Sequence, residues 1–258
     1  MREDYEKALE MDREFRKHKH REELFSKMIN MLNLRGDEII LDVGTGTGHL
    51  AEILSQKLPN GYIIGIDQSQ AMLKVARENI VKKNLSNYYV LKSHAEDIIF
   101  KDSTFEIAFL VISLHHFRDP MLALNEIYRV LKRDGTLVLY EPLGPKDLKL
   151  REVLEEAFKA GHPYHRVFGE EDIIGMLTKA GFIEETSEKI ILEFDQYGTE
   201  GIPMGPHYIH AYDLIAEKGD DDLLKKFRHE LFEIKKEDDR IHLKGSLKFL
   251  LSFSKKMF

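Results

Sequence analysis

The sequence has no cysteine and no tryptophan among its 258 residues. The absence of cysteine excludes disulfide bonds, thiolate metal ligands and a cysteine nucleophile, and it leaves the cytoplasm as the default compartment. No apolar run is long enough to cross a bilayer. The N-terminal stretch MREDYEKALEMDREFRKHKHREE is too charged and too acidic for a secretory signal or a transit peptide. We therefore expect a soluble, cytoplasmic protein without a membrane span.

Basic residues are fewer than acidic residues. With 38 Lys and Arg against 45 Asp and Glu, the net charge is −7, which argues against a large nucleic-acid footprint. The short basic run FRKHKHR has acidic neighbours on both sides and is interpreted as a solvated helix face. The motifs GxxxxGK[ST] and HExxH are absent, which argues against a nucleoside triphosphate and against a common type of zinc site. We expect no metal site.

The sequence does contain a regular alternation of short apolar runs and amphipathic segments. Residues 3–34 have the spacing of one or two amphipathic helices. Further along, we expect strands at 39–43, 62–66, 88–92, 107–112 and 136–140, and helices at 49–57, 69–83 and 121–131. Short buried strands that alternate with helices are typical of a doubly wound, mainly parallel sheet with helices on both faces. The predicted fold class is α/β.

The pattern is looser after residue 142. We expect helices at 148–159, 173–179 and 222–235, and strands at 182–194 and 246–254, which would complete a seven-stranded sheet. The stretch DQYGTEGIPMGPHYIHAY is rich in Gly, Pro, His and Tyr. The predicted organisation is an N-terminal helical segment (1–35), a core (36–195 and 244–258), and an inserted helical cap over the substrate site (196–243).

Three glycines stand directly after the first predicted strand, in LDVGTGTGHL. Gly44, Gly46 and Gly48 would let backbone N–H groups approach a ligand beside a helix N-terminus. Their spacing is GxGxG, and His49 stands where the dinucleotide fingerprint GxGxxG has its last glycine. Asp67 ends the second predicted strand, 19 residues after Gly48. That separation is typical of an acid that accepts both hydroxyls of a ribose.

Four segments in order extend this pattern: ILDVGTGTG, GIDQSQAMLKVAREN, SHAEDIIFKDSTFEIAFLVISLHHFRDP and RVLKRDGTLVLYEP. They resemble the successive motifs of class I S-adenosylmethionine-dependent methyltransferases, in the small-molecule branch that includes the ubiquinone and menaquinone biosynthesis enzymes. The match covers residues 37–142. The resemblance implies a Rossmann-like fold, S-adenosylmethionine as cofactor and S-adenosylhomocysteine as product. This cofactor has a ribose and an adenine but no phosphates, which agrees with the glycine spacing and the acid.

The resemblance also implies residue roles. Asp42 and the three glycines would surround the methionine part of the cofactor, and Asp67 would hold its ribose. Val111 would lie close to the sulfonium. The residues expected near the adenine are Gln68, Met72, His94, Ala95 and Glu96. Relatives usually have Asp or Asn where this chain has His94, and an unprotonated ring nitrogen of histidine can also accept a hydrogen bond from the adenine amino group.

Methyl transfer requires alignment of the acceptor, the methyl carbon and the sulfur, and the exclusion of water. If the acceptor is a hydroxyl, a general base assists, and the candidates are His115, His116 and Glu141. The histidine pair is equally well interpreted as a packing feature of the loop, and Glu141 as a binding or orienting group. Further histidines and tyrosines in the C-terminal half, taken together, would line an aromatic acceptor pocket: His162, His165, His207, His210, Tyr164, Tyr197, Tyr208 and Tyr212.

A small-molecule methyltransferase is the leading hypothesis. The first alternative is an RNA or protein methyltransferase, which the acidic balance and the absence of an appended nucleic-acid-binding module oppose. The second is a protein that binds S-adenosylmethionine without transferring its methyl group, because the glycine loop and Asp67 report binding alone. An NAD-dependent oxidoreductase is a distant further alternative. The sequence leaves the acceptor open, and leaves open whether the protein is a monomer or a homodimer.

Overall fold

The computed structural model describes residues 2–17, 19–159, 163–199, 202, 205–237 and 240–257. The helices are α1 (Arg2–Lys17), α2 (Lys19–Asn30), α3 (His49–Ser55), α4 (Gln70–Lys82), α5 (Pro120–Val130), α6 (Leu148–Lys159), α7 (Glu170–Lys179), α8 (Gly205–Glu217) and α9 (Asp221–Glu230), with a short 3₁₀ turn, η1 (Leu114–His116). The strands are β1 (Ile39–Val43), β2 (Tyr62–Asp67), β3 (Tyr88–Lys92), β4 (Phe105–Val111), β5 (Leu131–Leu143), β6 (Phe182–Tyr197), β7 (Phe232–Glu237) and β8 (Arg240–Lys256).

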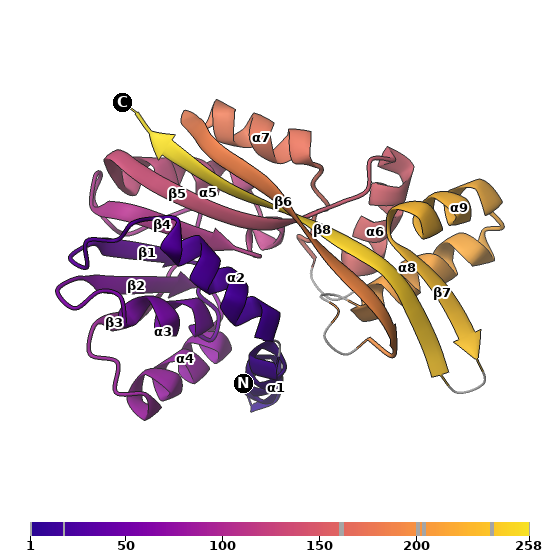
Figure 1. The fold of residues 1–258 in the computed structure, drawn as a ribbon, viewed down its shortest axis with the longest axis horizontal. Coiled ribbons are helices and arrows are strands. Elements are labelled where there is room, and N and C mark those ends of the chain that lie inside the picture. Colours follow the sequence, from indigo (N-terminus) through magenta and orange to yellow (C-terminus); the bar gives the residue numbers. More distant parts are fainter. Residues whose placement is uncertain are drawn as a thin grey trace.

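The strands form one mixed sheet with helices on both faces (Figure 1). Within the described residues its order is β3-β2-β1-β4-β5-β8-β6, and β7 also pairs with β8. The contacts among β1 to β5 are parallel, whereas β8 runs antiparallel to β5, β6 and β7. Strand order reverses at β1, where a doubly wound sheet places its ligand. The predicted Rossmann-like α/β class, with a mainly parallel sheet, is confirmed.

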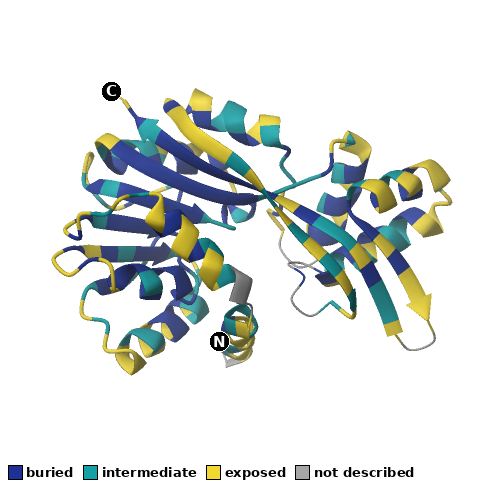
Figure 2. Ribbon diagram, in the orientation of Figure 1, coloured by how far each residue is buried: buried dark blue, intermediate teal, exposed yellow. Residues whose placement is uncertain are grey.

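Burial on both faces explains why the parallel strands are almost continuously apolar. On β1, Ile40 belongs to one hydrophobic cluster together with Leu54 of α3. Its neighbour Leu41 belongs to a second cluster with Ile127 of α5. Successive side chains on a strand point to opposite faces, so the apolar residues of the run IILDV are divided between the two clusters. Figure 2 shows the inner strands β1, β4 and β5 buried over most of their length, whereas only Tyr88 of the edge strand β3 is fully buried.

Two expectations about the C-terminal part need correction. Residues 222–235 were expected to be one helix, but α9 ends at Glu230 and β7 follows, which makes the sheet eight-stranded within the described residues. The reason is a change of period: Phe232 and Ile234 are buried while the residues between and after them are exposed, which suits a strand paired with β8. Strands β6 and β8 are also longer than expected, because they pair with each other almost from end to end.

The long strands β6 and β8 carry the segment that holds α8, α9 and β7. They run through residues 195–196 and 243–244, the predicted boundaries of the inserted cap, without interruption. Helix α6 contacts both α8 and α9, and Figure 1 shows this group beyond the carboxyl ends of the parallel strands. Among the described residues, no helix is both long and apolar enough to span a membrane.

Helix α1 packs against the core through buried charge, whereas α2 packs through the buried apolar side chains of Phe25, Met28 and Ile29. Glu52 of α3, with 3% of its surface exposed, accepts two hydrogen bonds from the Arg16 guanidinium of α1. The Lys83 ammonium, just past α4, pairs with the same carboxylate. At the start of α1, the Tyr5 hydroxyl donates to Glu78 of α4 at 2.7 Å. Because a buried carboxylate must be paired, Glu52 fixes α1 beside the glycine loop.

Candidate active site

The glycine loop leaves β1 in a left-handed backbone conformation at Gly44, Gly46 and Gly48, with φ of 72°, 56° and 85°. Two of these glycines are required by packing. A Cβ at Gly44 would lie 2.7 Å from the Cβ of Ser113, and one at Gly48 would lie 2.8 Å from the Tyr88 hydroxyl. A Cβ at Gly46 would meet nothing within 4 Å. Gly46 therefore faces open space, which its missing side chain leaves available to a ligand.

Asp67, at the end of β2, borders this open space. Its Oδ2 accepts a hydrogen bond from the Gly46 backbone N–H at 3.0 Å, and its Oδ1 accepts one from Ser69 at 2.8 Å. Burial raises the pKa of the Asp67 carboxyl, and the two backbone donors partly offset that effect. The side chain is half-buried. Asp67 thus holds the glycine loop in position while part of it stays accessible from the open side.

Asp42 is the second carboxyl group at this edge, and only 3% of its surface is exposed. The Thr45 hydroxyl donates to its Oδ2 at 2.5 Å and also lies 2.7 Å from the Tyr88 hydroxyl. Burial raises the pKa of Asp42 to about 6, and the charge of nearby Asp67 acts in the same direction. Asp42 therefore shapes the loop from inside through Thr45.

The residues expected near the adenine lie at the same edge of the sheet. The Ser93 N–H donates to the Asp67 carbonyl at 3.2 Å, which ties the chain after β3 to the end of β2. The following residues turn sharply, with an isolated bridge between His94 and Asp97. Ala95 is buried, Met72 and Glu96 are half-buried, and Gln68 and His94 are exposed. One oxygen of Glu96 accepts a hydrogen bond from the Asp119 N–H at 3.2 Å.

The loop after β4 carries the candidate bases. Ser113 donates to the Val43 carbonyl at 3.1 Å, which fixes η1 beside the glycine loop. Glu141 of β5 is completely buried, and its oxygens accept hydrogen bonds from the N–H groups of Leu114 and His115 at 3.2 and 3.3 Å. Nδ1 of His115 also pairs with Glu141. With both oxygens engaged, Glu141 orients the η1 turn and the His115 ring. Val111 ends β4, half-buried, just before this loop.

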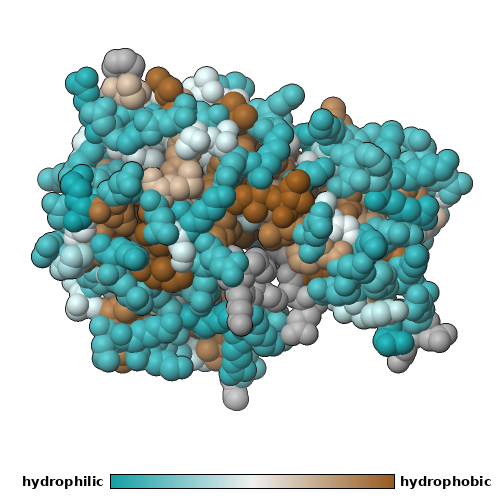
Figure 3. Space-filling model, in the orientation of Figure 1, coloured by the Kyte–Doolittle hydropathy of each residue, from teal (hydrophilic) through white to brown (hydrophobic). Residues whose placement is uncertain are grey.

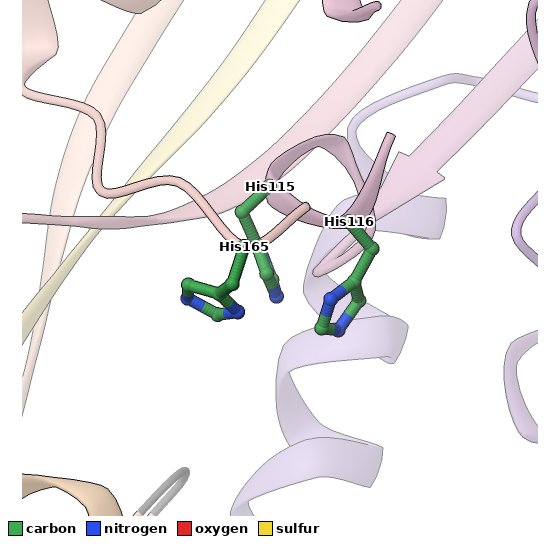
Figure 4. A group of neighbouring side chains, drawn as sticks. All are labelled: His115, His116 and His165. Atoms are coloured by element: carbon green, nitrogen blue, oxygen red, sulfur yellow. The ribbon is translucent and has the colours of Figure 1, made fainter. Parts of the chain in front are cut away.

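The structure adds a neighbour that the sequence pattern did not connect with the SLHHF motif. His165 lies between α6 and α7, and its ring centroid is 4.7 Å from that of His115 and 5.3 Å from that of His116. Figure 4 shows the three rings side by side, each with a nitrogen directed toward the others. His165 is 50 residues from His115 in the sequence, and no local pattern indicates that they are in contact. The contact depends on how the chain after α6 returns to η1.

The other expected aromatic residues are only partly brought together. Phe158 packs edge-on against His165 at 4.6 Å, and it also contacts Tyr208 of α8 at 5.4 Å and His207 at 5.5 Å. Tyr197 pairs instead with His242 on the far part of β6 and β8. Tyr212 packs on Phe227 of α9, Tyr164 and His210 are exposed, and His162 lies outside the described residues.

Comparisons with known proteins place this chain in a family. A family model described as a methyltransferase domain matches residues 41–139. A demethylmenaquinone methyltransferase of Lactobacillus johnsonii is 32% identical over 176 residues, which are 66% of this chain and 72% of that enzyme. The chain belongs to the S-adenosylmethionine-dependent methyltransferases. S-adenosylmethionine is the cofactor of this family.

Other relatives agree with this membership. The methyltransferase YcgJ of Bacillus subtilis, itself uncharacterised, is 32% identical over 138 residues, and the match spans only 54% of its length and 54% of this chain. The YcgJ crystal structure has a TM-score of 0.74 at 23% identity and covers 91% of this chain and 98% of that one, so it shows the shared fold. A Bacillus halodurans C-125 protein named as a methyltransferase also has a TM-score of 0.74, at 26% identity, and covers 91% of this chain and 99% of its own.

The residues of this methyltransferase fit the family cofactor. The open space at Gly46 lies next to a carboxylate that keeps part of its surface accessible. No lysine follows the glycines as in a triphosphate loop, and two carboxyl groups at the edge would repel phosphates. A ligand with a ribose and a positively charged sulfur suits both features.

Proposed function

We propose that this protein transfers the methyl group of S-adenosylmethionine to a small-molecule acceptor. The observation that carries the proposal is the arrangement at the carboxyl edge of the sheet. There, the open space at Gly46 borders Asp67 on one side, and the Ser113–His115 loop packs against the glycine turn on the other. A cofactor site and an oriented base thus share one edge, as methyl transfer requires.

In this proposal the cofactor-binding roles follow the order of the strands. The loop Gly44–Gly48 and Asp42 surround the methionine part, Asp67 accepts the ribose hydroxyls, and Val111 lies near the sulfur. Gln68, Met72 and the turn His94–Glu96 surround the adenine. When bound, S-adenosylmethionine supplies a methyl group on a sulfonium, whose sulfur leaves with the electron pair of the broken C–S bond. The chain itself has to orient the acceptor, hold a proton and exclude water.

His115 is the proposed base. If its Nδ1 carries the proton that Glu141 accepts, Nε2 has a free lone pair and can accept a proton from an acceptor hydroxyl. The buried carboxylate fixes both the ring orientation and the tautomer, as in other oriented imidazole bases. His116 is half-buried beside it and is the second candidate. Glu141 is a positioning residue in this scheme.

Where α2 covers the ends of β4 and β5 lies a cavity of about 10 Å³, which holds about one water molecule, so an acceptor would enter there only if α2 moved outward. Its lining is Arg21, Leu24, Phe25, Ile112, Tyr140, Leu192 and Phe249. Among the residues that the structure describes, no carboxylate lies within salt-bridge distance of Arg21, whose guanidinium stands 4.1 Å over the Phe15 ring. Burial lowers the pKa of Arg21 to about 10. A cation among apolar and aromatic walls favours an acceptor with an aromatic or apolar body and a negatively charged group.

The predicted cap is part of the same proposal. Residues 1–35 and 196–243 would close the substrate site around the core formed by 36–195 and 244–258. In support, α6, α8 and α9 lie beyond the carboxyl ends of the parallel strands (Figure 1), and Figure 3 shows hydrophobic side chains gathered where this group adjoins the core. The name of the Lactobacillus relative, demethylmenaquinone methyltransferase, also favours a ring-shaped acceptor. The net charge of −7 disfavours RNA.

A turnover screen tests this proposal. The purified chain is incubated with S-adenosylmethionine and with phenols, quinols and amines, each with and without a carboxylate, and S-adenosylhomocysteine is measured. We expect turnover with at least one aromatic acceptor, and an increased KM for the charged member in Arg21→Gln. Arg13→Gln, at an exposed position of α1, is the matched control. Binding of the cofactor without turnover on any class would instead support a non-catalytic binding protein.

A further inference from the structure

We propose that His115, His116 and His165 form a binding site for a divalent transition metal, of which zinc is the best fit. One ring nitrogen from each residue lies within 4.8 Å of the others. The rings come from two separate segments, the turn η1 and the chain between α6 and α7. His115 and His165 have only 2% of their surface exposed, while His116 is half-buried. Three imidazoles therefore converge in a protected place with one accessible side.

The ligand chemistry selects the metal. The cluster offers nitrogen only, with no carboxylate among its three members, and imidazole suits zinc, copper, iron, cobalt and nickel in contrast to magnesium or calcium. In a tetrahedral zinc site with Zn–N distances of about 2.0–2.1 Å, neighbouring nitrogens are about 3.4 Å apart. Small changes in the side-chain torsions would bring the three nitrogens, which lie within 4.8 Å of one another, to this spacing. Three protein ligands leave the fourth position for another molecule, as in catalytic zinc sites.

Glu141 supplies the outer partner that such a site requires. Metal-binding histidines usually donate their second ring N–H to a carboxylate or carbonyl, which fixes the ring and raises its basicity. Here Nδ1 of His115 pairs with the fully buried Glu141 carboxylate, which leaves Nε2 as the ligand atom. A carboxylate behind one imidazole would also compensate part of the positive charge of the ion.

Backbone contacts hold the two segments together without a metal. The Arg166 N–H donates to the His115 carbonyl at 3.1 Å. The next residue, Val167, donates its N–H to Glu155 of α6 at 3.0 Å. The carbonyl of Phe168 then accepts a hydrogen bond at 2.8 Å from the N–H of Gly144, which follows β5. The position of His165 relative to η1 is thus fixed by the main chain. A site that is already assembled loses less conformational entropy when the ion binds.

The metal would hold and activate the acceptor. Metal coordination lowers the pKa of a bound hydroxyl or water, so an acceptor oxygen at the fourth position would lose its proton to solvent before it attacks the methyl group. This use of the ion rests on the proposed methyl transfer, and it would replace His115 as the general base. Metal binding itself does not depend on methyl transfer and is measured separately.

The test is a metal titration of the 258-residue chain after treatment with a chelator and removal of that chelator. Zn²⁺ is titrated by calorimetry, and Co²⁺ is used as a probe because its visible absorption reports coordination number. We expect one equivalent of Zn²⁺ and the strong visible bands of four- or five-coordinate Co²⁺. His165→Gln should weaken Zn²⁺ binding more than about 100-fold, since removal of an outer carboxylate already costs about 10- to 100-fold. Glu141→Gln should fall within that smaller range.

The matched control is His229→Gln, at an exposed position of α9, which should bind Zn²⁺ like the unchanged chain. Circular dichroism and thermal unfolding check that each variant is folded. Equal Zn²⁺ affinity in the unchanged chain, His165→Gln and His229→Gln would overturn the proposal, as would octahedral Co²⁺ spectra throughout. Titration with S-adenosylmethionine in the same samples separates this result from the proposed function, because a chain without a metal site would still bind the cofactor.

Discussion

Replacement of Gly46 by alanine tests whether the glycine loop binds the cofactor or is only a tight turn. Gly46 and Gly219 have similar left-handed conformations, with φ of 56° and 65°, and a Cβ at either position meets nothing within 4 Å of protein. An L-residue in this conformation costs roughly 1–2 kcal/mol, and the reduced freedom of the unfolded chain returns about 0.4–1 kcal/mol. Both variants should therefore lose about 1 kcal/mol of stability, which lowers the melting temperature by about 2–4 °C.

The two variants should differ in cofactor binding. In Gly46→Ala the new methyl group projects into the space proposed for S-adenosylmethionine, while the backbone donor to Asp67 is retained. We expect at least a tenfold loss of affinity in Gly46→Ala, which corresponds to about 1.4 kcal/mol, and none in Gly219→Ala. Isothermal titration measures the affinities and calorimetric unfolding the stabilities. Equal affinity in both variants, with both folded, would refute the assignment of this space to the cofactor.

Three further predictions concern charge and catalysis. Folding raises the pKa of Asp42 to about 6, so the protonated carboxyl stabilises the fold below about pH 4, and this contribution is lost as the pH rises to about 6. The asparagine in Asp42→Asn does not titrate. Between pH 4 and pH 7, the free energy of unfolding of Asp42→Asn, measured with denaturant, should therefore rise by about 3 kcal/mol relative to that of the unchanged chain. Arg16→Ala removes one partner from Glu52, which keeps Lys83, and one from Asp12, and it should cost about 2 kcal/mol in the same assay, within the range of hydrogen bonds to charged groups. Lys7→Ala, which breaks an exposed pair, should leave the unfolding midpoint unchanged. His115→Ala should retain cofactor affinity and lower kcat by about 10²- to 10⁴-fold; unchanged turnover in a steady-state assay would remove His115 from the reaction.

The sequence was sufficient for the parts of the fold that depend on local pattern. The inner parallel strands are buried on both faces, so an apolar run such as IILDV indicates a strand directly. The glycine loop could be predicted because backbone positions with positive φ favour glycine, and three such positions follow the first strand. Asp67 could be predicted because an acid is expected at a fixed distance beyond the glycines.

Features that depend on long-range pairing could not be predicted in the same way. Strand β7 was mistaken for helix because KKFRHELFEIKK has apolar residues that suit either period, and only pairing with β8 decides between them. The convergence of His165 on His115 depends on the return of the chain after α6, for which no local signal exists. The engagement of Glu141 with the η1 turn is likewise a property of neighbouring strands.

The measurement that tests the central claim most directly is isothermal titration of the unchanged chain and of Asp67→Ala with S-adenosylmethionine, S-adenosylhomocysteine and NAD. The account predicts that the unchanged chain binds both sulfur nucleotides and does not bind NAD. It also predicts that Asp67→Ala, provided that it is folded, binds the sulfur nucleotides at least tenfold more weakly. Absence of binding to either sulfur nucleotide by the folded, unchanged chain would contradict the cofactor assignment and the methyl transfer proposed from it.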